Sequence, residues 1–244
     1  MRILLWLMII SVFISLDSPS FAQSLNISLG DAKTPLFTSK IIQFIGVITV
    51  LSLAPSILIM VTSFTRIVIV LSFLRTALGL QQTPPNLVIV SLALFLTMFI
   101  MTPTFEEAYQ SGLKPLMNEE IEEADAFQNI IAPFKTFMLK NTRGKDLSLF
   151  VEMGNEEQVE KRDLSLQIII PSFILSELKR AFEIGFLIFL PFLIIDMLVA
   201  SVLMAMGMMM IPPVTVSLPF KLIFFVLVDG WYMLCGSLVK SYGL

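Results

Sequence analysis

Three ionisable residues, Asp196, Lys221 and Asp229, interrupt the apolar C-terminal part of this 244-residue chain. Two acids in apolar surroundings can share one proton, which is the chemistry of an aspartyl catalytic dyad. The same acids can instead form ion pairs or face a water-filled pore, and structural ion pairs are far more common than dyads. We therefore interpret Asp196 and Asp229 as separate structural charges.

A second group of charges lies in Glu177–Glu183, and these charges sum to zero. On a helix, Glu177 can reach Arg180 three residues later, and Lys179 can reach Glu183 four residues later. The alternative is a long-range pair between Glu177 and a charge on a later helix or a neighbouring subunit. Both interpretations remain open at the level of sequence.

Lys221 is the candidate for that long-range partner of Glu177, and Asp196 is the other candidate partner for Lys221. An ionised side chain at the centre of a bilayer costs about 2.5–3.5 kcal/mol. We therefore expect these charges to face protein or water rather than lipid. The predicted set of buried charges used in subunit packing is Glu177, Asp196, Lys221 and Asp229.

The composition removes most other site chemistry. There is no histidine, which excludes most zinc sites, haem ligation by imidazole, and Ser-His-Asp or Cys-His catalysis. The single cysteine, Cys235, lies in an apolar run, where packing is its expected role. No HExxH, GxSxG, P-loop or GxGxxG motif is present. The sequence predicts a protein that is not an enzyme and that has no catalytic residue, metal or cofactor.

Five methionines fall within seven residues, and the double proline Pro212-Pro213 follows them. Methionine is unbranched and fills irregular or changing gaps without one fixed rotamer, while two prolines stop a helix from continuing normally. The pattern predicts a deformable apolar seal on a broken or reversing backbone. Ordinary apolar filler at a helical turn is the competing interpretation. The five residues are Met204, Met206, Met208, Met209 and Met210.

The overall composition indicates a membrane-associated protein, because 56% of the residues are hydrophobic, 14% are charged and the mean hydropathy is +0.88. Residues 1–22 have a basic start, an apolar run and the small-x-small site Ser20-Phe21-Ala22. These are the parts of a cleavable signal peptide, although an uncleaved first membrane helix is the alternative. Cleavage would leave residues 23–40 as an N-terminal periplasmic segment.

The predicted fold class is all-α and membrane-associated, with kinked helical hairpins and a small helical extracytoplasmic subdomain. Residues 41–105 form the first apolar hairpin, with a turn at the double proline Pro84-Pro85. Its link carries two arginines, Arg66 and Arg75, and no acid, which predicts a cytoplasmic position. Residues 164–244 form the second apolar hairpin, which contains the methionine-rich loop.

The intervening residues 106–163 are predicted to form an acidic periplasmic subdomain. Residues 104–163 hold 13 acidic and 7 basic side chains, a difference of −6. Apolar residues recur at three- and four-residue steps, which is typical of an amphipathic helix, and the margins of the segment read as solvated loops. The apolar positions are Phe127, Ile130, Ile131, Phe134, Phe137 and Met138.

Several long blocks of the chain resemble the FliP family, the P component of the flagellar type III protein export gate. The resemblance covers nearly all of residues 41–235, while the acidic segment matches in position and character more than in letters. The blocks are Ser63–Arg75, Gln81–Asn86, Pro171–Phe186, Pro191–Asp196, Met210–Pro213, Lys221 and Val228–Trp231.

The resemblance implies a pore-forming subunit present in five copies, which assembles with FliQ, FliR, FlhB and other export apparatus components. Unfolded flagellar proteins would pass through this core, and nucleic acid is not an expected partner. It also implies a bacterial inner-membrane location in the flagellar basal body, with much of the mature chain on the periplasmic side. The implied pore gasket is Met206, Met208, Met209 and Met210, and the implied assembly residues are Phe134, Phe137 and Phe150.

Three other interpretations compete with a flagellar gate. A related subunit of a virulence injectisome would share the same blocks. A small-solute transporter would use broken helices and midplane charges, yet the two apolar parts of the chain share no evident repeat. An intramembrane aspartyl protease would need Asp196 and Asp229 to act together.

Overall fold

The computed structural model describes residues 44–49, 52, 59–154, 160–161, 163–208 and 210–243. The predicted signal peptide (1–22), the segment 23–40 and Met209 lie outside the described residues. The chain divides into two units, 1–51 and 52–244. In the first unit residues 44–49 are helical, and all elements below belong to the second. Helices occupy most of the described residues and no strand occurs among them, which confirms the all-α prediction.

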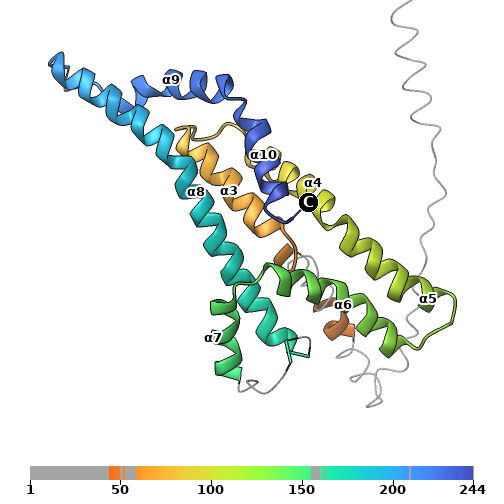
Figure 1. Cartoon of the computed structure of the whole chain (residues 1–244). Helices are drawn as coiled ribbons and strands as arrows, with labels where there is room; N and C mark the ends of the chain where they lie inside the picture. Colours follow the sequence, from red (N-terminus) through yellow and green to blue (C-terminus); the bar gives the residue numbers. More distant parts are fainter. Residues whose placement is uncertain are drawn as a thin grey trace, which may run out of the picture. The chain divides into compact units, whose positions relative to one another are not determined.

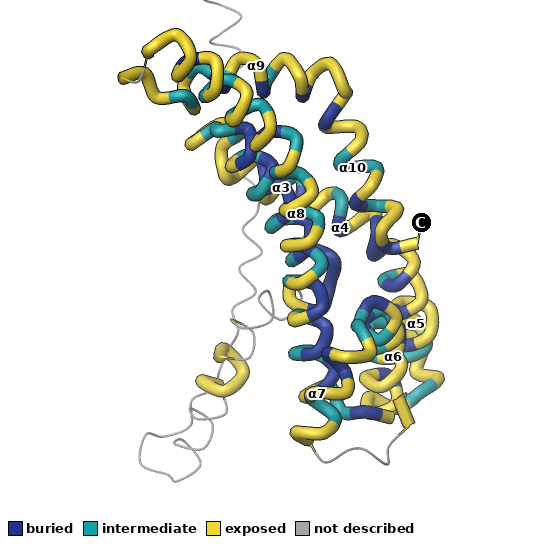
Figure 2. Tube along the Cα trace, turned by 60° about the vertical axis from the view of Figure 1, so that its left-hand side comes forward, coloured by how far each residue is buried: buried dark blue, intermediate teal, exposed yellow. Residues whose placement is uncertain are grey.

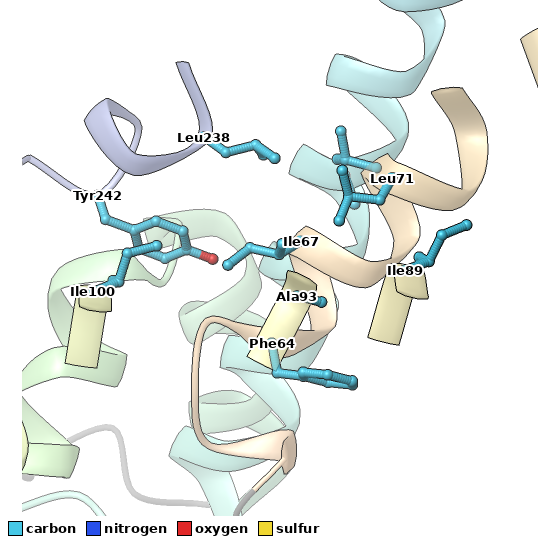
Figure 3. Close-up of a cluster of buried hydrophobic side chains, with 10 residues drawn as sticks. Phe64, Ile67, Leu71, Ile89, Ala93, Ile100, Leu238 and Tyr242 are labelled. Carbon is cyan, nitrogen blue, oxygen red and sulfur yellow. The ribbon is translucent and has the colours of Figure 1, made fainter. Parts of the chain in front are cut away.

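Helix α3 (Phe64–Ala77) is the central element of the second unit and lies between α8 (Leu166–Ala205) and α4 (Asn86–Ala108) (Figure 1). It is buried on several sides, because Ile67, Val70 and Leu71 are at most 1% exposed. Figure 3 shows how Ile67 and Leu71 meet side chains from α4 and from the C-terminal segment. A helix buried in this way positions any charge that it carries inside the protein.

The turn from α3 into α4 contains the double proline Pro84-Pro85, as the sequence predicts. Gly79, at φ 77°, ends α3, with the Gly79 amide donating to Thr76 O and the Leu80 amide donating to Arg75 O. This pair of bonds is the Schellman motif, in which a left-handed residue satisfies the last carbonyls of a helix. The Arg75 guanidinium then donates to Asn86 Oδ1 across the turn.

Helix α4 continues beyond the apolar run that predicts it. A π-helical turn (Tyr109–Leu113) and the short α5 (Lys114–Met117) extend it past residue 105. The π-helical turn packs against α6 (Glu123–Asn141), where a Cβ on Gly112 would lie 2.5 Å from the Ile130 side chain. A glycine is needed there because α6 approaches the backbone so closely.

Helices α6 and α7 (Gly144–Gly154) account for most of the acidic segment. Helix α6 contains the predicted amphipathic stretch, with Met138 buried and Phe127 exposed. Acids in its first turn, Glu123 and Asp125, suit the positive end of the helix dipole. Both helices pack against α8, and the shared apolar cluster includes Ile169 and Phe173 near its N-terminal end. The acidic segment therefore supports the N-terminal part of α8.

Helix α8 has 40 residues and remains one helix through Pro171 and Pro191. At 1.5 Å per residue it is about 60 Å long, twice the roughly 30 Å hydrocarbon thickness of a bilayer. The chain then returns through α9 (Pro213–Leu227) and α10 (Gly230–Lys240), which are bent by 62° relative to each other. The bend is the kinked element that the predicted fold class requires.

Two of the described helices, Asn86–Met117 and Leu166–Ala205, are long and apolar enough to cross a membrane by length and composition. The bent pair α9–α10 would make a third if it acts as one span. Much of the length of these helices is exposed (Figure 2). Many of the exposed residues are apolar, including Phe95 and Phe186. The second unit therefore presents apolar surface that lipid or other subunits must cover.

Candidate functional site: ion pairs and a methionine turn on one helical hairpin

The carboxylate of Glu177 is completely buried and pairs with Arg66, which lies one turn into α3. Arg66 Nε donates to Glu177 Oε2 at 2.9 Å, and its Nη2 donates to Oε1. Arg66 is 1% exposed. Two parallel bonds of this type are the strongest geometry available to a guanidinium and a carboxylate. The pair therefore fixes α3 to α8 in one register.

The last residues of the chain complete this pair. Tyr242 OH donates to Glu177 Oε2 at 2.5 Å, and Arg66 Nη1 donates to Ser241 Oγ at 2.9 Å. The Arg66 guanidinium carbon also lies 3.9 Å from the centroid of the Tyr242 ring, a cation–π contact. Figure 3 shows Tyr242 reaching from the C-terminal segment towards Ile67 of α3. Residues from three separate parts of the chain thus satisfy one another's charges.

This pairing differs from both sequence interpretations of Glu177. Its partner is neither the nearby Arg180 nor Lys221. Of the two predicted local pairs, only Lys179–Glu183 forms, at 3.5 Å and with both side chains more than half exposed. Arg66, interpreted from sequence as a topology signal, is instead a buried partner in the protein core.

Lys221 pairs with Asp196, which was the other candidate. Lys221 Nζ donates to Asp196 Oδ2 at 2.7 Å and to the Ala77 carbonyl of α3 at 3.1 Å. The Ser217 hydroxyl donates to the other oxygen of Asp196. The ammonium therefore satisfies one of the carbonyls that the end of α3 leaves free and places a cation at the negative end of that helix.

The Lys221–Asp196 ion pair and the Tyr242–Glu177 hydrogen bond connect the two sides of one helical hairpin. Glu177 and Asp196 both lie on α8, and their partners Tyr242 and Lys221 lie on the returning chain. Each pair also holds one end of α3, through Arg66 near its start and through Ala77 at its end. The charges in the apolar part of the chain thus join α3, α8 and the returning segments.

Asp229 does not share this arrangement, and its predicted role in subunit packing stays a prediction. It is exposed, it adopts a left-handed conformation at φ 50°, and none of the ion pairs among the described residues includes it. Its amide donates to Val226 O at the end of α9. Asp229 therefore shapes the bend between α9 and α10.

The bend also depends on Gly230. A Cβ at this position would lie 2.1 Å from Cε2 of Phe225, so any other residue would displace the aromatic ring. The Phe225 ring packs in turn against Trp231, with 5.5 Å between ring centroids. These contacts set the angle at which α10 returns towards α3.

A third polar network, which the sequence interpretation missed, lies one residue from Glu177. The Ser176 hydroxyl donates to Asp146 Oδ2 at 2.6 Å and accepts the Arg143 amide at 3.0 Å. Arg143 makes two further 2.8 Å bonds to the Asp146 carboxylate. Asp146 is 5% exposed. Two successive residues of α8 thus anchor α7 and α3.

Asp146 makes the attachment of α7 depend on pH. The Arg143 bonds lower the pKa of the Asp146 carboxyl against an opposing effect of burial, and Ser176 lowers it further. A carboxyl with a lowered pKa in the folded state stabilises that state above its unfolded pKa, and this contribution is lost as pH falls through the folded pKa. We expect the protection of the α7 amides, corrected for the intrinsic exchange rate at each pH, to fall as the pH drops below about 4. In an Asp146→Asn variant this pH dependence of the protection should disappear, and an unchanged dependence would contradict the assignment.

The methionines lie where α8 ends and the chain reverses. Gly207, at φ 76°, ends α8, with its amide donating to Met204 O and the Met208 amide donating to Leu203 O. This is a second Schellman motif. Pro212 and Pro213 then begin α9, where the first helical positions need no amide donor. We name residues 206–212 the methionine turn.

The described residues at the outer end of this hairpin are mostly exposed (Figure 2). Met206 is 60% exposed, Met208 46% and Met210 97%, while Met209 lies outside the described residues. Met204, on the last turn of α8, is 59% exposed. Filler in a helical turn would be covered by its own chain, so these methionines are available to something outside it.

The three predicted assembly aromatics are half-buried in the base of the same unit. Phe134 packs against Phe105 at 5.6 Å between centroids, and Phe137 packs against Phe173 and Tyr242 at 5.9 Å each. Phe150 contacts the cluster that contains Met138 and Phe173. These rings join α6 and α7 to α8.

The chemistry of this arrangement is mechanical rather than catalytic. Asp196 is held by Lys221 and Ser217, so it is engaged in an ion pair rather than poised opposite Asp229. Among the described residues no group of three acidic, histidine or cysteine side chains could hold a metal ion. What the geometry offers is a braced hairpin that carries soft apolar side chains at its outer end.

Comparison with known proteins gives one consistent result. Residues 47–238 match the FliP family. The flagellar biosynthetic protein FliP of Caulobacter vibrioides is 55% identical over 229 residues, which are 93% of this chain and 85% of the relative. The proteins of the same name from Rhizobium meliloti and Bacillus subtilis are 54% and 52% identical, over 84% and 88% of this chain and 84% and 98% of their own lengths.

Proposed function

This chain belongs to the FliP family, and from that membership we propose that it is a pore-forming structural subunit of the flagellar type III export gate. In this role it conducts unfolded flagellar proteins across the bacterial inner membrane, while the methionine turn closes the channel as a gasket. The shared name of the relatives, flagellar biosynthetic protein, favours this branch over an injectisome.

The exposed methionine turn is the observation that carries the proposal. Methionine side chains are flexible and apolar, so a ring of them can close on itself and still give way to a polypeptide of changing shape. Rigid branched side chains would adapt less well to such a passenger. The braced hairpin supplies the fixed support from which these side chains project.

The length of α8 supports assembly with other subunits. A helix of about 60 Å cannot lie within roughly 30 Å of hydrocarbon along the membrane normal. Exposed apolar residues nevertheless occur along much of it, from Leu175 to Met204. The part outside the hydrocarbon is covered by protein, in our proposal by four further copies of this chain together with FliQ, FliR and FlhB.

The exposed bend at Asp229 and the aromatic base contribute to this assembly in different ways. Asp229 is free to meet a cation of a neighbouring subunit, which would relieve the cost of an acid among exposed apolar residues. Phe134, Phe137 and Phe150 act from within, because they hold α6 and α7 in the position that a neighbour contacts. On this proposal the acidic helices lie on the periplasmic side.

Replacing Met208, Met209 and Met210 by glycine tests the gasket directly. We expect assembly to persist and the membrane to leak ions, on the order of tenfold above the wild-type background, because a closed apolar constriction excludes water and ions. The measurement is ion conductance of membranes that contain the assembled complex. The same measurement on variants with alanine at Met98 or Met233, which are exposed methionines on α4 and α10, provides the control. Wild-type conductance in the triple variant would contradict the gasket role.

A further inference from the structure

The hairpin that carries the methionine turn is closed at its other end by Ser241 and Tyr242, which directly follow α10. Glu177 and Tyr242 are 65 residues apart in sequence and are joined by the 2.5 Å bond from the Tyr242 hydroxyl. The methionine turn lies between them along the chain, about 42 Å beyond Glu177 along α8 at 1.5 Å per residue. The two ends of the hairpin are therefore connected through the rigid length of α8 and the bent return.

We infer that Ser241 and Tyr242 form a clasp that holds α10 against the Arg66–Glu177 pair and thereby keeps the methionine turn in its closed position. This inference rests on the proposed gasket role for its second half only. The residues of the clasp lie outside the methionine turn and outside the predicted charge and assembly residues.

The clasp is chemically complete. Glu177 accepts two bonds from Arg66 and one from Tyr242, so both of its oxygens have partners without water. The Tyr242 ring stacks on Phe137 at an interplanar angle of 17° and carries the Arg66 guanidinium near its centre. The tyrosine is thus held by a charge, a hydrogen bond and an aromatic ring at once, and it is 5% exposed.

Helix α10 has few other attachments, which gives the clasp its importance. Of its eleven residues only Gly230 and Leu238 are buried. Gly230 is at the bend, so Leu238, 1% exposed and packed in the cluster around Ile67, is the only buried side chain of the helix beyond it. The partly buried Leu234 and Val239 add weaker packing against the same cluster. A helix held mainly by one fully buried side chain opens locally at low cost unless a further contact holds its end.

The clasp also keeps water away from the Arg66–Glu177 pair for as long as α10 stays in place. Removing Tyr242 uncovers a buried ion pair, and water would then compete for the Arg66 and Glu177 groups. Helix α9 begins directly after the methionine turn, and only two residues separate α9 from α10. Movement of α10 is therefore transmitted through α9 to the methionine turn. The hairpin opens at its outer end when the clasp opens at its base.

The experiment measures opening of α10 by cysteine accessibility in membranes that contain the assembled, full-length protein. The background is Cys235→Ser, which removes the only native thiol. Leu238→Cys then places a thiol in the buried position, and its rate of modification by N-ethylmaleimide reports how often α10 lifts away. Ion conductance of the same membranes is the second readout.

Two clasp variants are compared with one matched control. Tyr242→Phe keeps the ring on Arg66 and Phe137 but removes the bond to Glu177, while Tyr242→Leu removes both. We expect the modification rate to rise about tenfold in Tyr242→Phe and further in Tyr242→Leu, since a bond to a charged buried partner is lost. Tyr232→Phe removes the hydroxyl of a tyrosine on α10 that is 77% exposed, and it should leave the rate unchanged.

Each result decides one half of the inference. Faster modification together with raised conductance supports both halves. An unchanged modification rate in both Tyr242 variants overturns the clasp. Faster modification without raised conductance, when the glycine variant of the methionine turn does leak, overturns the link between clasp and gasket. Absence of a leak in the glycine variant contradicts the proposed gasket, and the modification rate still decides whether the clasp exists.

Discussion

Replacing Glu177 by alanine is expected to destabilise the protein by about 3–5 kcal/mol, because it leaves Arg66 as an unpaired buried cation. Arg66 is 1% exposed and would retain only the hydroxyl of Ser241 and the face of Tyr242 as partners. Natural domains are stable by only 5–15 kcal/mol, so this loss removes a large part of the total. The measurement is the amount of protein in the membrane and its resistance to unfolding by a denaturing detergent.

Removing the whole pair separates the charge from the contact. We expect the double variant Arg66→Met with Glu177→Leu to recover most of the stability that Glu177→Ala loses, because a buried pair can be replaced by apolar residues of similar volume at little cost. The exposed Lys179–Glu183 pair is the control, and Glu183→Ala should change stability by less than about 1 kcal/mol. Equal losses in Glu177→Ala and Glu183→Ala would contradict the burial of Arg66 and Glu177.

The second large effect is an asymmetry between the partners of the other pair. Asp196→Ala leaves the Lys221 ammonium, whose side chain is 4% exposed, with the Ala77 carbonyl as its remaining partner. Lys221→Met leaves Asp196, whose side chain is 31% exposed and still receives the Ser217 hydroxyl. We expect a loss of about 3–5 kcal/mol for Asp196→Ala and about 1–3 kcal/mol for Lys221→Met.

Unfolding by the same detergent measures both variants, and motility reports their function. Ser217→Ala isolates the weaker bond to Asp196 and should cost less than either charge variant. A larger loss for Lys221→Met than for Asp196→Ala would show that the aspartate, rather than the lysine, is the charge that depends on its partner.

The parts of the fold that follow from local pattern could be predicted from the sequence. The double prolines mark both reversals, since proline acts on its own neighbours. The three- and four-residue recurrence from Phe127 to Met138 lies within α6, because an amphipathic helix is defined by its own side chains. The methionine turn follows for the same reason, with Gly207 providing the left-handed end of α8.

The partners of the buried charges could not be predicted, because they are far apart in the chain. Arg66 and Glu177 are separated by 111 residues, and Tyr242 gave no signal of its own as a tyrosine near the end of an apolar segment. The short-range rule for Glu177 and Arg180 is physically sound, yet a bidentate partner in a dry core outcompetes a nearby surface charge. Asp146 and Ser176 were missed because they are ordinary polar residues until α7 packs on α8.

The length of α8 could not be predicted from the sequence, because charged residues interrupt its apolar runs. Charges near Glu177 and at Asp196 divide the sequence into short uncharged runs, of which only Met197–Phe220 reaches spanning length. In the structure that run is broken by the methionine turn, while the charged stretches lie inside the helix because Arg66 and Lys221 neutralise them. A helix is continuous wherever its charges are satisfied, which a count of uncharged residues does not detect.

The distance along the chain between Arg66 and Glu177 also has a consequence for synthesis. A ribosome adds about 5–20 residues per second, so the 111 residues between the two partners take roughly 5–20 s to emerge. During that interval the new α3 carries a cation that cannot settle in hydrocarbon. The α3–α8 contact can therefore form only after residue 177 has been made, late in the synthesis of the chain.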